Sequence, residues 1–342
     1  MNSANAILLV GHPNVGKSVL FHRLTGAYVN VSNYPGTTVE VTRASARFDT
    51  EINLLDTPGV LSLPSRSDDE RATMRALLNE PSRCLVQVGD AKNLRRTLTL
   101  TALLAELGLP LVLALNMHDE ATARGVTVDV EALAEELAIP VLSTVATGGE
   151  GVSELAGSLS RAAVPDRMLQ YDAQLESDIS AMTQAIDDVA AHPLLASRGL
   201  AILFLGDDDE VNHWLAFKAG DRFKQLQALR DQARIGAEHQ LAAMLSRQRT
   251  EAADALAGSV TQRAVRSTPL LSQRIGQAVV HPVWGLPILL GVLYAVYQFV
   301  GVFGATTLVG LFEESLFEGI LNPAFASLVE HWFGDSWMTE LL

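Results

Sequence analysis

The sequence predicts three parts in succession: an α/β domain over residues 1–164, an all-α helical domain over residues 165–262, and a membrane segment over residues 263–342. Short apolar runs alternate with segments of helical period in the first part, helix-forming residues dominate the second, and a long uncharged apolar run occupies the third. The fold expected for the first part is a mostly parallel sheet with helices on both faces. The third part is expected to contain a C-terminal transmembrane helix.

Five short apolar runs in the first part are expected to be buried strands. Longer amphipathic segments separate them, as at residues 94–107 and 130–137. Alternation of strands and helices produces parallel strands that are covered on both faces. The five expected strands cover residues 6–10, 52–55, 84–88, 109–115 and 139–142.

The second part has few strand signals. It is rich in Ala, Leu, Gln, Arg and Glu, most clearly over residues 223–249, and these residue types have high helix propensity. We therefore expect a helical domain, in which residues 201–206 are the one candidate strand.

The third part begins with a run that lacks charge. Between Arg274 and Glu313 there is no Asp, Glu, Lys or Arg. This exceeds the ~20 residues that a helix needs to cross a bilayer, so we expect a transmembrane helix at about 283–311 and an amphipathic tail after it. Arginines precede the run and acidic residues follow it, which predicts that the first 274 residues are cytoplasmic. The alternative is a buried core helix of a soluble domain.

Composition excludes several classes of protein. The chain has 25 Lys and Arg against 39 Asp and Glu, a net charge of -14, so no nucleic-acid partner is expected. Cys84 is the single cysteine, which excludes an intramolecular disulfide and a cysteine-based zinc cluster. Cys84 begins an apolar strand pattern, so we expect it in the core.

Residues 11–18 match the phosphate-loop pattern G-x-x-x-x-G-K-[ST], directly after the first expected strand and before a helix. In such a loop, backbone N–H groups and Lys17 bind phosphate oxygens, and Ser18 ligates Mg²⁺. His12 occupies a variable position of the motif and is expected to face solvent. Nucleotide contacts are expected from Gly11, His12, Pro13, Asn14, Val15, Gly16, Lys17, Ser18 and Val19.

Asp56-Thr57-Pro58-Gly59 follows the second expected strand. Asp56 is placed to hold Mg²⁺ through a water, and the Gly59 amide is placed to sense a γ-phosphate. Val60 and Leu61 stand where many regulatory GTPases carry a water-orienting glutamine. Activation of water by a side chain from these positions is therefore excluded.

Asn116-Met117-His118-Asp119 follows the fourth expected strand. A carboxylate there accepts two hydrogen bonds from guanine that adenine cannot offer, so a buried Asp119 would select GTP over ATP. After the fifth strand, Val145-Ala146 replaces the Ser-Ala usual in a base-contacting loop. The order of the motifs predicts a P-loop GTPase. The expected base-side contacts are Asn116, Met117, Asp119, Val145, Ala146 and Thr147.

A polar loop at residues 33–40 lies between the first two motifs. In a GTPase of this kind, one threonine of this loop ligates Mg²⁺ while the γ-phosphate is present and releases it after hydrolysis. The sequence therefore predicts a switch loop here.

With these motifs, the chain resembles the bacterial ferrous iron transport protein B (FeoB) family. The likeness covers nearly the whole chain, and the motif at the start of the membrane segment, joined to the nucleotide motifs, selects this family. The residues that carry it are the phosphate loop with Asn14, residues 33–40, 55–60, 113–120, Asp90-Ala91-Lys92-Asn93-Leu94, Gly149-Glu150-Gly151 and His281-Pro282-Val283-Trp284-Gly285-Leu286-Pro287.

The resemblance implies a slow, K⁺-stimulated GTPase that regulates Fe²⁺ uptake across the bacterial inner membrane, with GTP or GDP, Mg²⁺ and K⁺ bound. The helical domain would be a nucleotide-release-inhibitor-like domain. The residues implied by the resemblance are Asn14, Asn33 and Tyr34 for K⁺, Ser18, Thr38 and Asp56 for Mg²⁺, and Asn14, Lys17, Thr38 and Gly59 for catalysis.

The resemblance also implies partners. Family members are longer and have further spanning helices, and one span cannot enclose an ion path. We expect the chain to be either a fragment or a stand-alone subunit that contacts the lipid bilayer and the remaining permease domain or a second membrane subunit. A homo-oligomer and small accessory proteins of the uptake system are also expected. The alternatives are a soluble K⁺-activated GTPase acting in RNA modification or ribosome assembly, and a switch that binds GTP without hydrolysing it.

Overall fold

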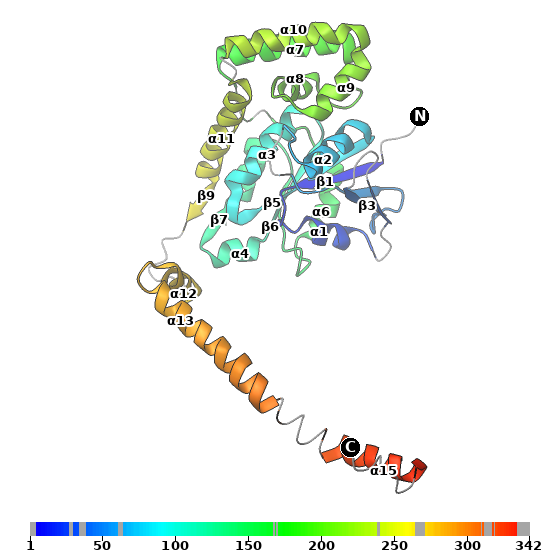
Figure 1. Ribbon diagram of the computed structural model, residues 1–342. Coiled ribbons are helices and arrows are strands. Elements are labelled where there is room, and N and C mark those ends of the chain that lie inside the picture. Colours follow the sequence, from blue (N-terminus) through cyan, green and yellow to red (C-terminus); the bar gives the residue numbers. More distant parts are fainter. Residues whose placement is uncertain are drawn as a thin grey trace. The chain divides into compact units, whose positions relative to one another are not determined.

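A computed structural model describes residues 5–26, 30–33, 39–60, 64–166, 168, 170–237, 240–263, 271–308, 310, 317 and 319–333. The chain divides into two compact units, Met1–Val265 and Arg266–Leu342. The first unit contains a central sheet with helices around it and a group of longer helices, and the second contains the apolar helices (Figure 1).

The sheet of the first unit has seven strands in the order β2-β3-β4-β1-β5-β6-β8. All neighbouring pairs from β4 to β8 are parallel, whereas β2 and β3 join the edge in antiparallel pairs. All five expected strands are present. The strands are β1 (Ala6–Gly11), β2 (Asn30–Asn33), β3 (Glu40–Ser45), β4 (Asn53–Asp56), β5 (Ser82–Asp90), β6 (Leu111–Asn116) and β8 (Val141–Ser143).

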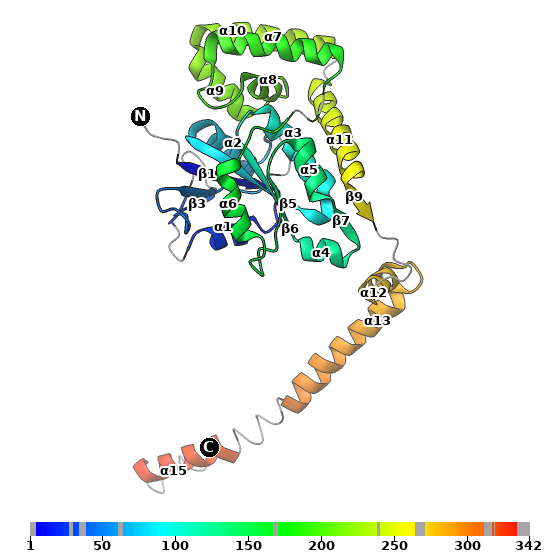
Figure 2. The same ribbon diagram turned by 180° about the vertical axis from the view of Figure 1, so that it is seen from behind.

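Helices cover both faces of this sheet (Figures 1 and 2). Successive side chains of a strand point to opposite faces, so Leu8 and Val10 of β1 join one core cluster while Ile7 and Leu9 join the other. The sequence-based fold class is thereby confirmed for this domain. Its helices are α1 (Lys17–Leu24), α2 (Asp68–Asn79), η1 (Ala91–Asn93), α3 (Leu94–Glu106), α4 (His118–Ala123), α5 (Val130–Leu137), α6 (Val152–Ser158) and η2 (Leu159–Arg161).

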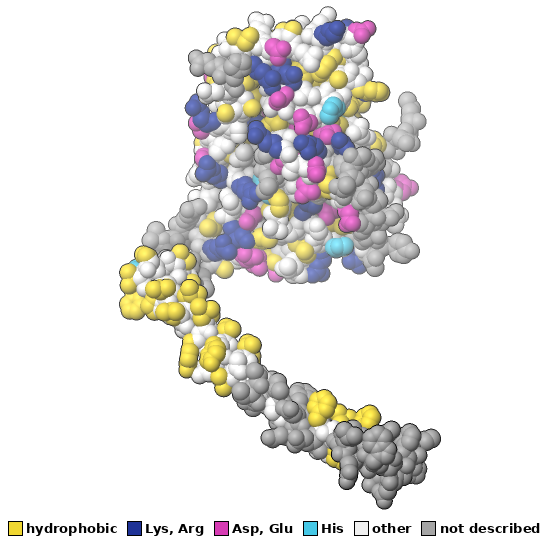
Figure 3. Space-filling view, viewed as in Figure 1, with side chains coloured by type: hydrophobic (Ala, Val, Ile, Leu, Met, Phe, Trp, Pro, Cys, Tyr) yellow, Lys and Arg dark blue, Asp and Glu magenta, His cyan; other side chains and the backbone are white. Residues whose placement is uncertain are grey.

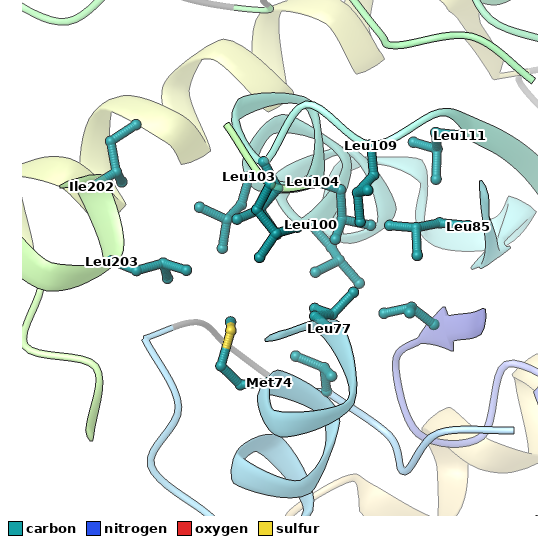
Figure 4. Packing of buried hydrophobic residues seen from close by; sticks show 14 of the residues in the cluster. Met74, Leu77, Leu85, Leu100, Leu103, Leu104, Leu109, Leu111, Ile202 and Leu203 are labelled. Atoms are coloured by element: carbon teal, nitrogen blue, oxygen red, sulfur yellow. The ribbon is translucent and has the colours of Figure 1, made fainter. Parts of the chain in front are cut away.

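The first core cluster continues from the sheet into the helical domain. In Figure 4, Met74 and Leu77 of α2, together with leucines of α3, lie between the sheet and Ile202 and Leu203 of α8 (Ser197–Leu205). The two domains therefore share one hydrophobic core. The remaining helices of the helical domain are α7 (Ala173–Ala190), α9 (Asp209–Ala219), η3 (Gly220–Arg222), α10 (Phe223–Gly236) and α11 (Leu241–Val260).

The candidate strand at residues 201–206 was predicted wrongly, because this segment belongs to α8. Every side chain from Leu200 to Leu205 is at most 1% exposed. A helix that is buried on all sides has no polar face, so its short apolar sequence cannot be distinguished from a buried strand by periodicity.

A two-stranded ribbon closes the first unit. Strand β9 (Thr261–Arg263) follows α11 and pairs antiparallel with β7 (Val126–Val128), and the Asp129 amide adds a bond of 2.9 Å to the Val260 carbonyl. Strand β7 lies immediately after α4. The end of the helical domain is therefore attached to the α/β domain beside the helix that follows the base motif.

The second unit contains α12 (Leu271–Val280), α13 (Gly285–Val296), η4 (Tyr297–Leu308), which is wound as a π-helix, and α15 (Asn322–Phe333). Residues Gly285–Gly304 form a continuous helical stretch of 20 residues with a mean hydropathy of 2.0, and none of it is buried. Hydrophobic side chains cover the described part of α13 in Figure 3. A core helix would be covered by protein, so length, hydropathy and exposure together fit the expected transmembrane helix.

Cys84 lies in the core as expected, at 1% exposure on β5. Burial raises the pKa of its thiol to about 11. Since only the thiolate reacts with iodoacetamide, we expect alkylation at pH 8 to be about 10²-fold slower in the folded protein than in urea-unfolded protein. Mass spectrometry of the single-cysteine chain measures both rates, and complete labelling under native conditions would contradict this burial.

Asp208, which is fully buried, lies at the contact between the α/β and helical domains. One carboxylate oxygen accepts hydrogen bonds from the Ser65 amide (2.6 Å) and hydroxyl (2.5 Å), while the other accepts from the amides of Glu210 and Val211 at 3.0 Å each. Burial raises the pKa of Asp208, and these four donors offset the cost of holding a carboxylate there. Asp208 thus caps α9 and also holds Ser65, which precedes α2.

Asp208→Ala should lower the free energy of unfolding by about 2–4 kcal/mol, because it removes a helix cap and leaves four buried donors without their acceptor. Urea denaturation monitored by circular dichroism measures the change. The neighbouring variant Asp209→Ala is the control, since the ion pair of Asp209 with Arg71 is partly exposed and should be worth less than about 1 kcal/mol. Equal effects of the two variants would refute the role assigned to Asp208.

Candidate guanine-nucleotide site

The phosphate loop connects β1 to α1 through two residues with positive φ. Asn14 has φ 63° and Gly16 has φ 83°. A side chain at Gly16 would also collide with the amide of Asn116. Asparagine tolerates the left-handed conformation better than most residues, and glycine adopts it without strain. The backbone therefore requires glycine at position 16 and favours asparagine or glycine at position 14.

Lys17 and Asp56 form a buried ion pair, with 7% and 9% of their surfaces exposed. They line a cavity of about 440 Å³ between the phosphate loop and the Asp56–Gly59 turn. Ser18 also lines this cavity, so a hydroxyl and a carboxylate are presented together with an ammonium group. Oxygen ligands of this kind suit Mg²⁺, and the ammonium suits phosphate, so the residues fit a magnesium–nucleotide group. The remaining lining residues are His12, Pro13, Asn14, Gly16, Val19, Glu40, Thr42, Thr57, Pro58 and Gly59.

The Asp56–Gly59 turn is packed directly against the phosphate loop. The Val60 amide donates to the Gly11 carbonyl at 2.9 Å, and the Thr57 hydroxyl donates to the Leu9 carbonyl at 2.8 Å. A Cβ atom at Gly59 would lie 2.8–2.9 Å from atoms of Pro13, which is too close for any side chain. Glycine is therefore needed to bring this turn beside the phosphate loop.

Asn116 joins the phosphate side of the site to the base side. Its amide nitrogen donates to the Val15 carbonyl at 2.8 Å, and its amide oxygen accepts from the Ala146 N–H at 2.9 Å and the Thr144 hydroxyl at 3.3 Å. The side chain is 3% exposed. Asn116 thus fixes the base loop relative to the phosphate loop, and the sequence reasoning had assigned it a nucleotide contact without this role.

Asp119 is in the first turn of α4, and Met117 precedes that helix with φ 62°. The expectation that Asp119 is buried was wrong, because its side chain is exposed. Helix α4 begins two residues after the carboxyl end of β6, and its first turn is at the surface. Asp119 nevertheless follows Asn116 closely in the chain, and the Asn116 side chain contacts the base loop.

The base loop differs from the usual Ser-Ala sequence without losing its backbone bonds. Val145 and Ala146 are buried, whereas Thr147 is exposed. The Val145 amide donates to the Glu150 carbonyl at 3.0 Å, and the Gly149 amide donates to the Val145 carbonyl at 2.8 Å. The valine therefore packs inward while the loop closes through its main chain.

The expectation that His12 faces solvent was also wrong, since the side chain is only 4% exposed. It lies between the phosphate loop and α3, where it lines a second, smaller cavity together with Asn93 and Arg96. Burial and the positive charge of Arg96 lower the pKa of His12 to about 4. The imidazole is therefore neutral at pH 7.

Tyr34 and Thr38 lie outside the described residues, and Asn33 is described only by its backbone, at the end of β2. Asn14 is exposed and lines both cavities of the site.

Sequence reasoning gave no role to two basic residues beside the base motifs. Lys92 donates to Glu120 at 2.8 Å and to the Met117 sulfur at 3.0 Å. Arg23 donates to the carbonyls of Ala146 and Thr147. Neither residue belongs to a nucleotide motif, so no spacing pattern could have indicated these contacts.

Known proteins resemble this chain over both the α/β domain and the helical domain. Residues 5–159 match the family described as ferrous iron transport protein B, and residues 171–262 match the FeoB cytosolic helical domain. The chain belongs to the FeoB family. The sequence-based recognition of this family is confirmed, and the matches do not favour a soluble GTPase that acts on RNA.

Relatives of this FeoB-family chain include the Fe(2+) transporter FeoB of Staphylococcus aureus, which is 31% identical over 295 residues, covering 85% of this chain and 44% of the relative. The FeoB of Salmonella typhimurium is 31% identical over 298 residues, covering 84% of this chain and 37% of the relative. The chain thus spans less than half the length of these relatives.

Among solved structures, the cytosolic domain of L. pneumophila FeoB is similar, with a TM-score of 0.68 and 27% identity, over 75% of this chain and 100% of that one. A GDP-bound mutant of the S. thermophilus FeoB G domain has a TM-score of 0.66 and 26% identity over the same shares. The α/β domain followed by a helical domain is therefore the architecture of this family.

Proposed function

We propose that the chain is the GTP-binding and GTP-hydrolysing regulatory part of a ferrous iron uptake system of the bacterial inner membrane. The observation that carries this proposal is the convergence of the phosphate loop, the Asp56–Gly59 turn and the Asn116–Asp119 motif at one end of the sheet, in a chain of the FeoB family. GDP in a structure of a family member supports guanine nucleotide as the ligand.

The geometry supports distinct roles for the residues of the phosphate side. Bound Mg²⁺ would supply a positive charge that stabilises the phosphate oxygens. Lys17 would exchange its partner Asp56 for those oxygens, which leaves the Asp56 carboxylate and the Ser18 hydroxyl to hold the ion. The Gly59 amide would then sense the γ-phosphate, and Thr38 would complete the Mg²⁺ site from the switch loop.

We propose slow, K⁺-stimulated hydrolysis, as the family resemblance implies, and the apolar residue after the Asp56–Gly59 turn supports a slow rate. Val60 is apolar and fully buried, so it cannot activate water. We assign charge stabilisation instead to K⁺, held by Asn14 and by backbone carbonyls at Asn33 and Tyr34. A cation at that place would stabilise the negative charge that develops on the phosphates, as an arginine does in other GTPases.

The membrane part of the proposal rests on the apolar helix and on the family. Gly285–Gly304 would cross the inner membrane, with the two preceding domains in the cytoplasm. Fe²⁺ would pass through further membrane helices supplied by the rest of a longer polypeptide or by a second subunit, because one span cannot enclose a path. We further propose a homo-oligomer, and the fusion of Fe(2+) transport protein A to FeoB in Porphyromonas gingivalis supports small accessory proteins as partners.

Asp119→Asn tests the guanine site directly. In the full chain, reconstituted in lipid nanodiscs, GTP affinity should fall about 10- to 100-fold, because the charged acceptor of two hydrogen bonds is lost. Xanthine nucleotide should gain affinity, because its ring offers the complementary donor and acceptor. The control is Asp231→Asn, an exposed aspartate of α10. Guanine selectivity that is unchanged by Asp119→Asn would refute the assignment, and turnover equal to buffer in both K⁺ and Na⁺ would leave only nucleotide binding.

A further inference from the structure

The tip of the base loop is held by a side chain from a different element. Within the loop, backbone bonds use the Val145 carbonyl and the Glu150 carbonyl. The next two carbonyls, those of Ala146 and Thr147, accept from Arg23 of α1, at 3.1 Å to Nε and 2.5 Å to Nη2. One planar guanidinium therefore binds two successive carbonyls, a geometry that a lysine cannot reproduce.

These contacts fix Ala146 from two sides. Its N–H donates to the Asn116 side chain at 2.9 Å, and its carbonyl accepts from Arg23. The loop also passes close to the guanidinium at Gly149, where an added Cβ would lie 3.6–3.7 Å from Arg23 atoms. The peptide expected to contact the base is therefore positioned by one residue of the base motif and one residue of α1.

Arg23 also links the two halves of the site. Helix α1 begins at Lys17, so the helix that carries Arg23 starts at the phosphate-binding lysine. Helix α6, which follows the base loop, lies beside α1 in Figure 2. Both Arg23 bonds end on carbonyls of the base loop, and neither ends on the phosphate loop.

We propose that Arg23 is a positioning residue that clamps the base loop and slows the release of guanine nucleotide. This inference rests on the proposed function and specifies how that site retains its ligand. Removal of the clamp lets the loop open more often, which accelerates dissociation, while the encounter of nucleotide with the phosphate loop is unaffected.

Stopped-flow release of a fluorescent GDP analogue from the full chain in nanodiscs tests the clamp. Arg23→Ala should raise the dissociation rate about tenfold, since two charge-assisted bonds at a partly exposed place are lost. The association rate should stay within about twofold. Arg23→Lys, which supplies a point charge without the fork, should fall between Arg23→Ala and wild type. Arg83→Ala, at an exposed arginine of β5, is the matched control and should release the analogue at the wild-type rate.

A merely structural role is separated by one further measurement. The thermal midpoint of nucleotide-free Arg23→Ala should stay within about 2 °C of wild type. Wild-type release rates in Arg23→Ala would overturn the clamp while leaving the proposed function intact. Failure of the wild-type chain to bind the analogue would overturn the proposed function and the clamp with it.

Discussion

Lys17→Ala is expected to abolish GTP hydrolysis, with kcat/KM falling by at least about 10²–10³-fold, because the ammonium that would stabilise the phosphate charge is removed from a largely buried place. Low surrounding polarity strengthens such an interaction relative to water. Initial rates of phosphate release from the full chain in nanodiscs, with Mg²⁺ and K⁺ present, measure the change.

Lys17 also has a structural role that the experiment must separate. Its ion pair with Asp56 is buried, so Lys17→Ala alone leaves a carboxylate without the partner that compensates its burial, and the protein should lose stability. The double variant Lys17→Ala/Asp56→Asn removes that charge and should recover stability in urea denaturation. Its hydrolysis rate is no test of Lys17, because Asp56 itself belongs to the expected Mg²⁺ site. Circular dichroism of Lys17→Ala at the assay temperature separates loss of hydrolysis from loss of fold, and an unfolded spectrum would assign the loss to unfolding.

The control for this series is Lys218→Ala, a lysine of α9 in the helical domain that lies over the ring of Trp214. It removes the same charge at a place remote from the phosphate loop and should leave the hydrolysis rate unchanged. Hydrolysis by Lys17→Ala within tenfold of wild type would contradict the assignment of Lys17 to the phosphates.

Much of the fold could be predicted because buried parallel strands have continuous apolar sequences. The expected runs at residues 6–10 and 84–88 correspond to β1 and β5. Strand β2 was not predicted, since its sequence Asn-Val-Ser-Asn lacks an apolar run. Helix α8 was mistaken for a strand, because its complete burial removes the polar face from which helix periodicity is recognised.

The parts of the site in which a sequence motif fixes the local backbone could be predicted. The parts that depend on tertiary packing could not. The motif spacing predicts that Gly16 and Gly59 lie at the phosphate site, and the close contacts at both positions require glycine. The burial of His12 depends on α3, about 80 residues further along the chain, and the contacts of Arg23 depend on a loop more than 120 residues away. Such contacts arise from tertiary structure and leave no local pattern.

Asn14→Ala is expected to reduce the ratio of GTPase rates in K⁺ and Na⁺ to about one, since the amide oxygen that would hold the ion is removed; in systems that use an arginine for this purpose the effect reaches about 10³–10⁵. Binding of GDP should remain nearly intact, because backbone N–H groups and Lys17 carry the phosphate contacts. Paired initial rates in the two salts, at equal ionic strength, measure the ratio.

The control variant for Asn14→Ala is chosen from the backbone conformation at Asn14. With φ 63°, alanine at this position costs about 1–2 kcal/mol and could distort the phosphate loop, whereas glycine adopts the conformation freely. Asn14→Gly therefore removes the amide without the strain. If the amide holds K⁺, both variants lose the stimulation and Asn14→Gly retains wild-type GDP affinity. Stimulation that persists in Asn14→Gly would assign the effect to loop geometry and would contradict a role for the Asn14 side chain in binding K⁺.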